Sequence, residues 1–281
     1  MKIREILKLL RVINDAMVGG AVVLSQIVAL RSLPDISTAL LGFATGFFLS
    51  AAAMVSNDIA DLEVDAVNAP HRPLVQGSVS IKEAWLVFAL CSIAGITSSV
   101  LLGPLCCMLA AAALLTSVLY NFKVKAYGLV GNAFVSFNVA LPFLFGEISL
   151  GTSSLELTLN KLFFVMAFFA NMSREVVKDV ADVEGDRRRG LKTLPIALGQ
   201  ERALVVALVL MLIAVAGSIL PFLLGLAGVL YLALVATADA VFVSSALRVL
   251  RRPSKNEALK CKQRFLVGML FALLAFVSSI V

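Results

Sequence analysis

The sequence is poor in the residues on which many soluble enzymes depend. It has one histidine, His71, which argues against a hydrolase built on histidine and suits a polar surface or substrate-edge position. Its four cysteines show no metal-ligand spacing. Charged residues make up only 15% of the 281 residues, hydrophobic residues make up 60%, and mean hydropathy is +0.98. A soluble core cannot hide so much apolar surface, so the composition predicts a polytopic membrane protein.

Long apolar runs recur along the whole chain. A helix crosses a bilayer with about 20 mostly apolar residues, and on this rule we predict an all-α protein with nine spans in one transmembrane domain, 1–281. The expected spans cover roughly residues 12–30, 36–56, 82–101, 104–122, 127–147, 161–178, 203–219, 221–246 and 263–281.

The basic residues are distributed unevenly between the loops. All except Arg31 and Lys161 fall at the amino terminus or beside the loops after the second, fourth, sixth and eighth spans. The positive-inside rule therefore predicts a cytoplasmic amino terminus in the cell membrane. This asymmetry and the attraction to anionic head groups account for the pI of about 9.3, so we expect a lipid bilayer and no nucleic acid as partner.

Two acidic stretches match each other. "NDIADLEVD" at 57–65 and "KDVADVEGD" at 178–186 carry Asp, Ala, Asp, Glu and Asp in the same five places. They follow the second and sixth spans, which predicts two parallel four-helix repeats plus one helix, with both stretches on the cytoplasmic face. Two solvated helix ends are the alternative reading, but the match between the stretches favours a shared function.

Helical spacing would align the polar groups in each stretch. Asn57, Asp61 and Asp65 are four residues apart, as are Asp182 and Asp186. Such a row of like charges repels itself unless a cation compensates it. Carboxylates with water and phosphate oxygens suit Mg²⁺. Basic residues stand nearby at Arg72, Lys123, Lys125, Lys178, Arg187, Arg188, Arg189 and Lys192. Acids for a metal and bases for phosphate together predict a bound diphosphate.

The chain resembles the UbiA-type intramembrane prenyltransferases over nearly its whole length. The resemblance is carried by "NDIADLEVD", by "RPL" at 72–74 and by "DVEGD" at 182–186. It implies nine helices around a central cavity and an isoprenyl diphosphate donor. It also implies two Mg²⁺ ions, held by Asn57, Asp61, Asp65, Asp182 and Asp186, of which the four aspartates are the expected catalytic residues.

Further residues are expected to bind substrate, and they are Asn14, Asp58, Arg72, Lys123, Lys125, Lys178 and Asp179. One feature departs from the family pattern. Many members carry Tyr-x-x-x-Lys after the fourth span, whereas here Tyr120 is followed by Lys123 and Lys125. Each lysine is therefore open to two readings, contact with diphosphate or anchoring of the span at the membrane surface.

The acceptor is suggested by "SREVVKDVADVEGD" and "KTLPIALG", which resemble the archaeal branch of the family. That branch attaches a second geranylgeranyl chain to geranylgeranylglyceryl phosphate, a lipid-like acceptor. Its phosphate requires a second anion site, for which Lys8, Arg11, Asn14 and 187–189 are available, although these residues would equally suit a cytoplasmic surface.

Two alternatives remain at this point. Related branches prenylate the aromatic ring of a quinone precursor or a porphyrin, which composition does not exclude. A membrane transporter is a more remote alternative, because the acids gather at one edge of the membrane and midplane charges are scarce, with Asp239 the clearest.

Overall fold

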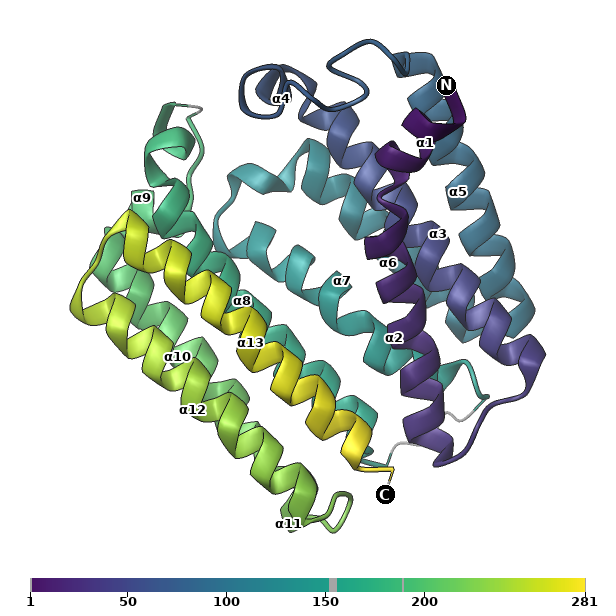
Figure 1. Cartoon of the computed structure of the whole chain (residues 1–281), viewed down its shortest axis with the longest axis vertical. Coiled ribbons are helices and arrows are strands. Elements are labelled where there is room, and N and C mark those ends of the chain that lie inside the picture. The colour runs from purple at the N-terminus through teal and green to yellow at the C-terminus, as the bar shows by residue number, and fades with distance from the viewer. Residues whose placement is uncertain (1, 152–155, 189, 281) are drawn as a thin grey trace. The chain divides into compact units, whose positions relative to one another are not determined.

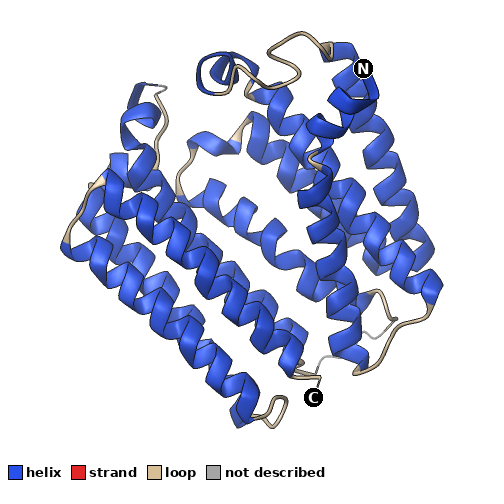
Figure 2. Cartoon of the chain, viewed as in Figure 1, coloured by secondary structure: helices blue, strands red, loops and turns tan. Residues whose placement is uncertain are grey.

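The structure, a computed structural model, describes residues 2–151, 156–188 and 190–280 (Figure 1). Within these ranges all regular secondary structure is helical (Figure 2), which confirms the all-α prediction. Eight helical segments are long and apolar enough to cross a membrane, so the chain is a multi-pass membrane protein. They are α2 (Val12–Leu30), α3 (Ile36–Ala60), α5 (Ile81–Leu102), α6 (Pro104–Phe122), α7 (Leu129–Ile148), α10 (Gln200–Ser218) with α11 (Leu220–Leu223), α12 (Val229–Arg251) and α13 (Lys255–Ser278).

The expected span at 161–178 lies within α8 (Leu159–Arg188), a helix of 30 residues. Lys161, Arg174 and Glu175 interrupt its apolar sequence, so α8 is not one of the eight segments and the count of nine spans stays a prediction. The remaining helices are short: α1 (Lys2–Leu10), α4 (Leu62–Asn68), the 3-10 turn η1 (Val124–Ala126) and α9 (Leu194–Leu198).

One expected span start is wrong. The segment at 221–246 does not begin at Pro221, which lies in the first turn of α11; Gly225, with φ +69°, follows that turn, and α12 begins at Val229. A positive φ suits glycine and ends a helix. Helix α13 begins at Lys255, before the expected span at 263–281, because the hydroxyl of Ser254 accepts a hydrogen bond from the backbone N–H of Glu257 and caps the helix.

The chain forms two compact units. Unit 1 comprises Met1–Lys123 and Leu141–Ser154, and unit 2 comprises Val124–Ala140 and Leu155–Val281. Helix α7 contributes to both units, and Pro142 lies next to the point of division. Proline cannot donate a backbone hydrogen bond, so the helix ladder is weakened at this residue.

In unit 1, α3 packs against α2, α5 and α6. Glycines bring α2 and α3 close together, since a Cβ added to Gly46 would meet the Cα of Gly19 at 3.1 Å. Small residues at a helix contact let two backbones approach closely in a membrane. This packing holds the helix whose last turn carries the start of the first acidic stretch.

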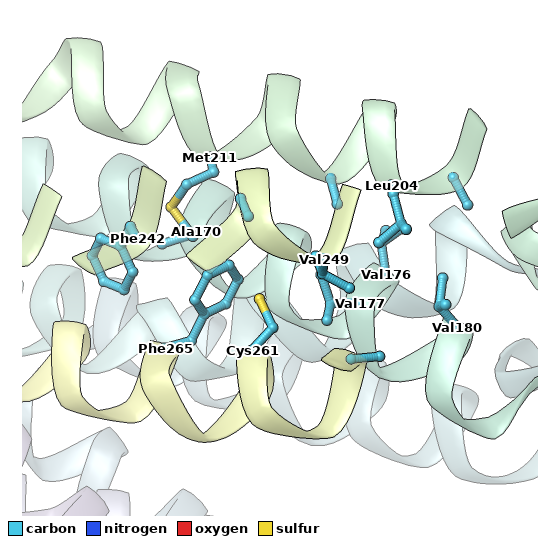
Figure 3. Packing of buried hydrophobic residues seen from close by; sticks show 14 of the residues in the cluster. Ala170, Val176, Val177, Val180, Leu204, Met211, Phe242, Val249, Cys261 and Phe265 are labelled. Carbon is cyan, nitrogen blue, oxygen red and sulfur yellow. The ribbon is translucent and has the colours of Figure 1, made fainter. Parts of the chain in front are cut away.

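In unit 2, α8, α10, α12 and α13 enclose a hydrophobic core (Figure 3). Phe242 and Phe265 meet edge to face, with ring centroids 5.6 Å apart. Cys261 is a buried free thiol in this core and acts as a small apolar side chain. Val176, Val177 and Val180 of α8 belong to the same core, which therefore holds the part of α8 that carries the second acidic stretch.

Candidate functional site

The first acidic stretch covers the junction of α3 and α4. Helical spacing of the polar groups assumes that the helix of the second span continues through this stretch. Helix α3 ends at Ala60, and the backbone changes at Asp61, with φ −96° and ψ 11°. Two helical hydrogen bonds nevertheless continue through the junction. The N–H of Asp61 donates to the carbonyl of Asn57 at 2.9 Å, and that of Asp65 to the carbonyl of Asp61 at 2.8 Å. The three polar residues therefore still follow one another a single turn apart.

Asp58 is the most enclosed acid of this stretch, with 3% of its surface exposed. Its Oδ1 atom accepts hydrogen bonds from Arg11 Nη2 at 2.5 Å and from Arg72 Nη1 at 3.0 Å. Arg72 also pairs with the buried carboxylate of Asp65. Arg11 adopts the left-handed conformation, φ 54° and ψ 50°, which is costly for a residue with a side chain. Two guanidinium groups thus compensate two buried carboxylates.

Asn57 and Asp61 are tied to α6 through Asn121, which sequence reasoning missed. The amide nitrogen of Asn57 donates to Asp61 Oδ2 at 3.1 Å and to Asn121 Oδ1 at 3.3 Å. Asn121 in turn donates to Ser56 Oγ at 2.8 Å. Because the nitrogen of Asn57 is engaged as a donor, its amide oxygen is the atom suited to a cation. The sequence feature that could have identified Asn121 is an amide side chain at the end of an apolar span.

The second acidic stretch lies in the last part of α8, in unit 2. Asp179 accepts a hydrogen bond from Asn132 Nδ2 of α7 at 2.9 Å, a contact that sequence reasoning also missed. Lys178 pairs with the buried Glu175 at 3.2 Å. Asp182 is exposed, whereas Asp186, four residues later, is buried. The stretch therefore combines a carboxylate open to a ligand with others held by packing and hydrogen bonds.

The remaining predicted binding residues are more scattered. Lys123 is exposed at the end of α6, and Lys125 is half-buried in η1. Asn14 is exposed on α2, whereas the next residue, Asp15, is buried and accepts a hydrogen bond from Ser50 Oγ at 2.7 Å. The last predicted residues lie in the arginine run: Arg187 is exposed, and Arg189 and the side chain of Arg188 fall outside the described residues.

The donor atoms suit a hard cation. Carboxylate oxygens of Asp61, Asp65, Asp182 and Asp186 and the amide oxygen of Asn57 are ligands that Mg²⁺ prefers. Arg72 engages Asp65 through Oδ2, and a carboxylate has a second oxygen that can accept another partner. Across the described ranges no three His, Cys, Asp or Glu side chains are already gathered as a metal site, so the ligand set stays a prediction.

Comparison with known proteins identifies the family. The model of the UbiA prenyltransferase family matches residues 18–278. The chain belongs to this family. Two relatives are similar over almost the full length of both chains, and both are named digeranylgeranylglyceryl phosphate synthase. The protein of Methanopyrus kandleri is 37% identical, covering 99% of each chain, and that of Thermococcus kodakarensis is 35% identical, covering 98% of each chain.

Solved structures agree with the UbiA fold. One of them has a TM-score of 0.88 and 31% identity over 99% of each chain, and it is described as giving insights into digeranylgeranylglyceryl phosphate synthase in membranes. A UbiA homologue from Archaeoglobus fulgidus, bound to GPP and Mg²⁺, has a TM-score of 0.66 and 20% identity, covering 97% of this chain and 99% of that one. The second likeness supports the fold alone.

Proposed function

We propose that this prenyltransferase transfers a geranylgeranyl group from geranylgeranyl diphosphate to the hydroxyl of geranylgeranylglyceryl phosphate. The product is the ether that completes the digeranylgeranylglyceryl phosphate of archaeal membranes. The observation that carries the proposal is full-length similarity, at 35 to 37% identity, to synthases of this name. An aromatic acceptor and a transporter are not favoured by these comparisons.

In this proposal Asn57, Asp61, Asp65, Asp182 and Asp186 hold Mg²⁺, with two ions expected. When bound, Mg²⁺ stabilises charge on the leaving diphosphate. The use of Mg²⁺ is supported by the donor atoms of these residues. The Archaeoglobus fulgidus homologue of the same fold is itself bound to GPP and Mg²⁺. Four basic residues are assigned to the diphosphate oxygens, and they are Arg72, Lys123, Lys125 and Lys178.

The chemical step breaks the bond between the allylic carbon and the diphosphate oxygen. The glycerol hydroxyl then forms an ether bond with that carbon, and its proton passes to a carboxylate or to the departing diphosphate. Apolar surroundings limit water, which would otherwise capture the allylic cation. Asp58 and Asp179 are assigned to positioning: Asp58 holds Arg11 and Arg72, and Asp179 accepts from Asn132.

The acceptor's own phosphate also needs cations. Lys8, Arg11 and the arginines at 187–189 are the proposed source, with the amide of Asn14 as a neutral hydrogen-bond donor, and Arg11 is supported by its half-buried guanidinium beside the first acidic stretch. The dephosphorylated glycerol ether should then be a much poorer substrate. Comparing turnover of the two acceptors tests this part of the proposal.

We further propose that the two units serve one transmembrane domain in the cell membrane, with a cytoplasmic amino terminus and both acidic stretches facing the cytoplasm. The skew of basic residues supports this orientation. Single cysteines placed at 57–80 and 179–200 should react with an impermeant reagent from the cytoplasmic side only, and those at 148–160 from outside only. Acidic stretches on opposite faces would exclude a common substrate.

The decisive experiment supplies purified protein with isotope-labelled geranylgeranyl diphosphate, Mg²⁺ and candidate acceptors in turn. Mass spectrometry should detect an ether from geranylgeranylglyceryl phosphate. A carbon-prenylated aromatic product, with no ether, would refute the acceptor assignment while leaving prenyl transfer intact.

A further inference from the structure

A basic patch at the turn between α12 and α13 has no part in the proposed reaction. Five exposed basic residues form this patch, and they are Arg248, Arg251, Arg252, Lys255 and Lys260. Between positions 248 and 260 the only acid is Glu257, which pairs with Lys260 at 3.0 Å. The patch therefore keeps a large positive charge. We propose that it binds the phosphate head groups of anionic bilayer lipids.

The turn holds its cations in a defined arrangement. The N–H of Arg252 donates to the carbonyl of Arg248 at 3.2 Å, Pro253 restricts the backbone, and Ser254 caps α13. Helices α12 and α13 pack extensively against each other in unit 2. The five basic residues thus lie in and beside a short connection between two firmly packed helices, with Arg252 in the connection itself and the other four in the adjoining helices.

Helix stability alone does not account for these charges. Arg248 and Arg251 lie in the last turn of α12, where a cation interacts favourably with the helix dipole. Lys255 is the first residue of α13, where a cation is unfavourable because the backbone N–H groups there carry partial positive charge. Ser254 caps the start of α13 and Glu257 lies in its first turn, but Glu257 pairs with Lys260, so an anion bound at the turn would compensate Lys255 and the neighbouring arginines.

The position of the turn between α12 and α13 relative to the membrane indicates which anion it binds. Both α12 and α13 are long and apolar enough to span a bilayer, so the turn joining them lies at a membrane surface, where lipid phosphates surround it. Leu259 is 41% exposed between Lys255 and Lys260, and an apolar side chain there suits the boundary between head groups and acyl chains. Charge and position together fit anionic lipids better than a soluble partner.

The test measures lipid binding to the full chain in detergent by native mass spectrometry, with phosphatidylglycerol or phosphatidylcholine added. Removing one cation near a membrane surface weakens anionic lipid binding about fivefold. The triple variant Arg251→Gln, Arg252→Gln, Lys255→Gln should therefore bind phosphatidylglycerol on the order of 100-fold more weakly. Its binding of phosphatidylcholine should not change.

A matched control removes the same charge from exposed positions elsewhere, in the triple variant Arg4→Gln, Lys82→Gln, Arg202→Gln. It should retain phosphatidylglycerol as the unmodified chain does. Because the substituted residues are exposed, both variants should keep the melting temperature of the parent. Equal lipid loss in both triple variants, or none in the first, would overturn the proposal. So would displacement of phosphatidylglycerol by millimolar inorganic phosphate, which would indicate a site for soluble anions.

Discussion

Arg11 donates a hydrogen bond from Nη2 to Oδ1 of Asp58 at 2.5 Å, although 47 positions separate the two residues. The pair joins the break between α1 and α2 to the last turn of α3. Arg72 donates to the same oxygen atom at 3.0 Å. One buried carboxylate therefore serves as counter-ion to two guanidinium groups, and its removal affects both.

This relationship predicts strong coupling between Arg11 and Asp58. In a double-mutant cycle with Arg11→Gln and Asp58→Asn, we expect a coupling free energy of about 1 to 3 kcal/mol. Asp58→Asn removes the counter-ion of the Arg11 guanidinium, and Arg11→Gln leaves the buried Asp58 carboxylate with Arg72 as its one remaining guanidinium partner. Unfolding in mixed micelles by denaturing detergent, followed by circular dichroism, provides the measurement. Strictly additive effects would show that the contact contributes nothing to stability.

The two acidic stretches should act in one reaction. Asp61→Ala and Asp182→Ala are each expected to lower turnover on the order of 100-fold or more, because each removes a group that stabilises the leaving diphosphate. The double variant should be little worse than either single variant, since groups that act as a unit are non-additive. Exposed glutamates of the same stretches, Glu63 and Glu184, supply alanine controls with near-normal turnover.

Chelation should abolish prenyl transfer, and added Mg²⁺ should restore it. Asp61→Asn keeps the shape of the side chain but removes its charge, so the Mg²⁺ concentration for half-maximal activity should rise while the melting temperature changes little. A titration of activity against free Mg²⁺ makes the comparison. Full activity in the presence of excess chelator would contradict a metal-dependent mechanism.

A pH effect on stability is expected at the start of α3. Hydrogen bonds from Ser37 and Thr38 lower the pKa of the Asp35 carboxyl from 3.8 to about 2. Because the pKa of Asp35 is lower in the folded state, the stability that its charged carboxylate contributes is complete above about pH 4. This stability is lost as the pH falls toward about 2. Asp35→Ser should keep the cap but remove that pH dependence, whereas Asp35→Ala should lower the melting temperature at neutral pH. Melting curves across this range test both expectations.

Close packing in unit 1 should make Gly146 intolerant of a side chain. A Cβ at this position would meet the Cβ of Ser25 at 2.4 Å and the carbonyl oxygen of Val22 at 2.6 Å. Gly146→Ala should therefore destabilise the protein by about 1 to 3 kcal/mol. Gly20 is the control, because a Cβ there meets nothing within 4 Å. Detergent-induced unfolding should separate the two variants, and equal stability would contradict this packing.

Much of the fold follows from the apolar runs. Spans such as 12–30 and 104–122 are found where the sequence places them, because a mostly apolar run in a membrane has to form a helix to satisfy its backbone. The predicted span start at residue 221 is wrong because hydropathy does not detect residues that break a helix. Pro221 and Gly225 interrupt the helix while leaving the segment as apolar as before.

Less of the candidate site could be predicted. Helical spacing correctly relates Asn57, Asp61 and Asp65, since hydrogen bonds between neighbouring turns are local. The partners that hold these stretches, Asn121 and Asn132, come from distant helices. No periodicity in the sequence specifies which two helices pack together, so contacts over 64 and 47 positions emerge only from the folded chain.

Neither unit is one uninterrupted length of chain, because α7 begins in unit 2 and ends in unit 1. Ser25 and Gln26 of α2 are buried, and their hydrogen-bond acceptors include the carbonyl of Phe143 and the hydroxyl of Ser149. During synthesis these acceptors leave the ribosome only after the first half of α7 has been made. The earliest inserted helices therefore gain these hydrogen bonds late, and unit 1 receives its last segment only after residues 124–140, the first segment of unit 2, have been synthesised.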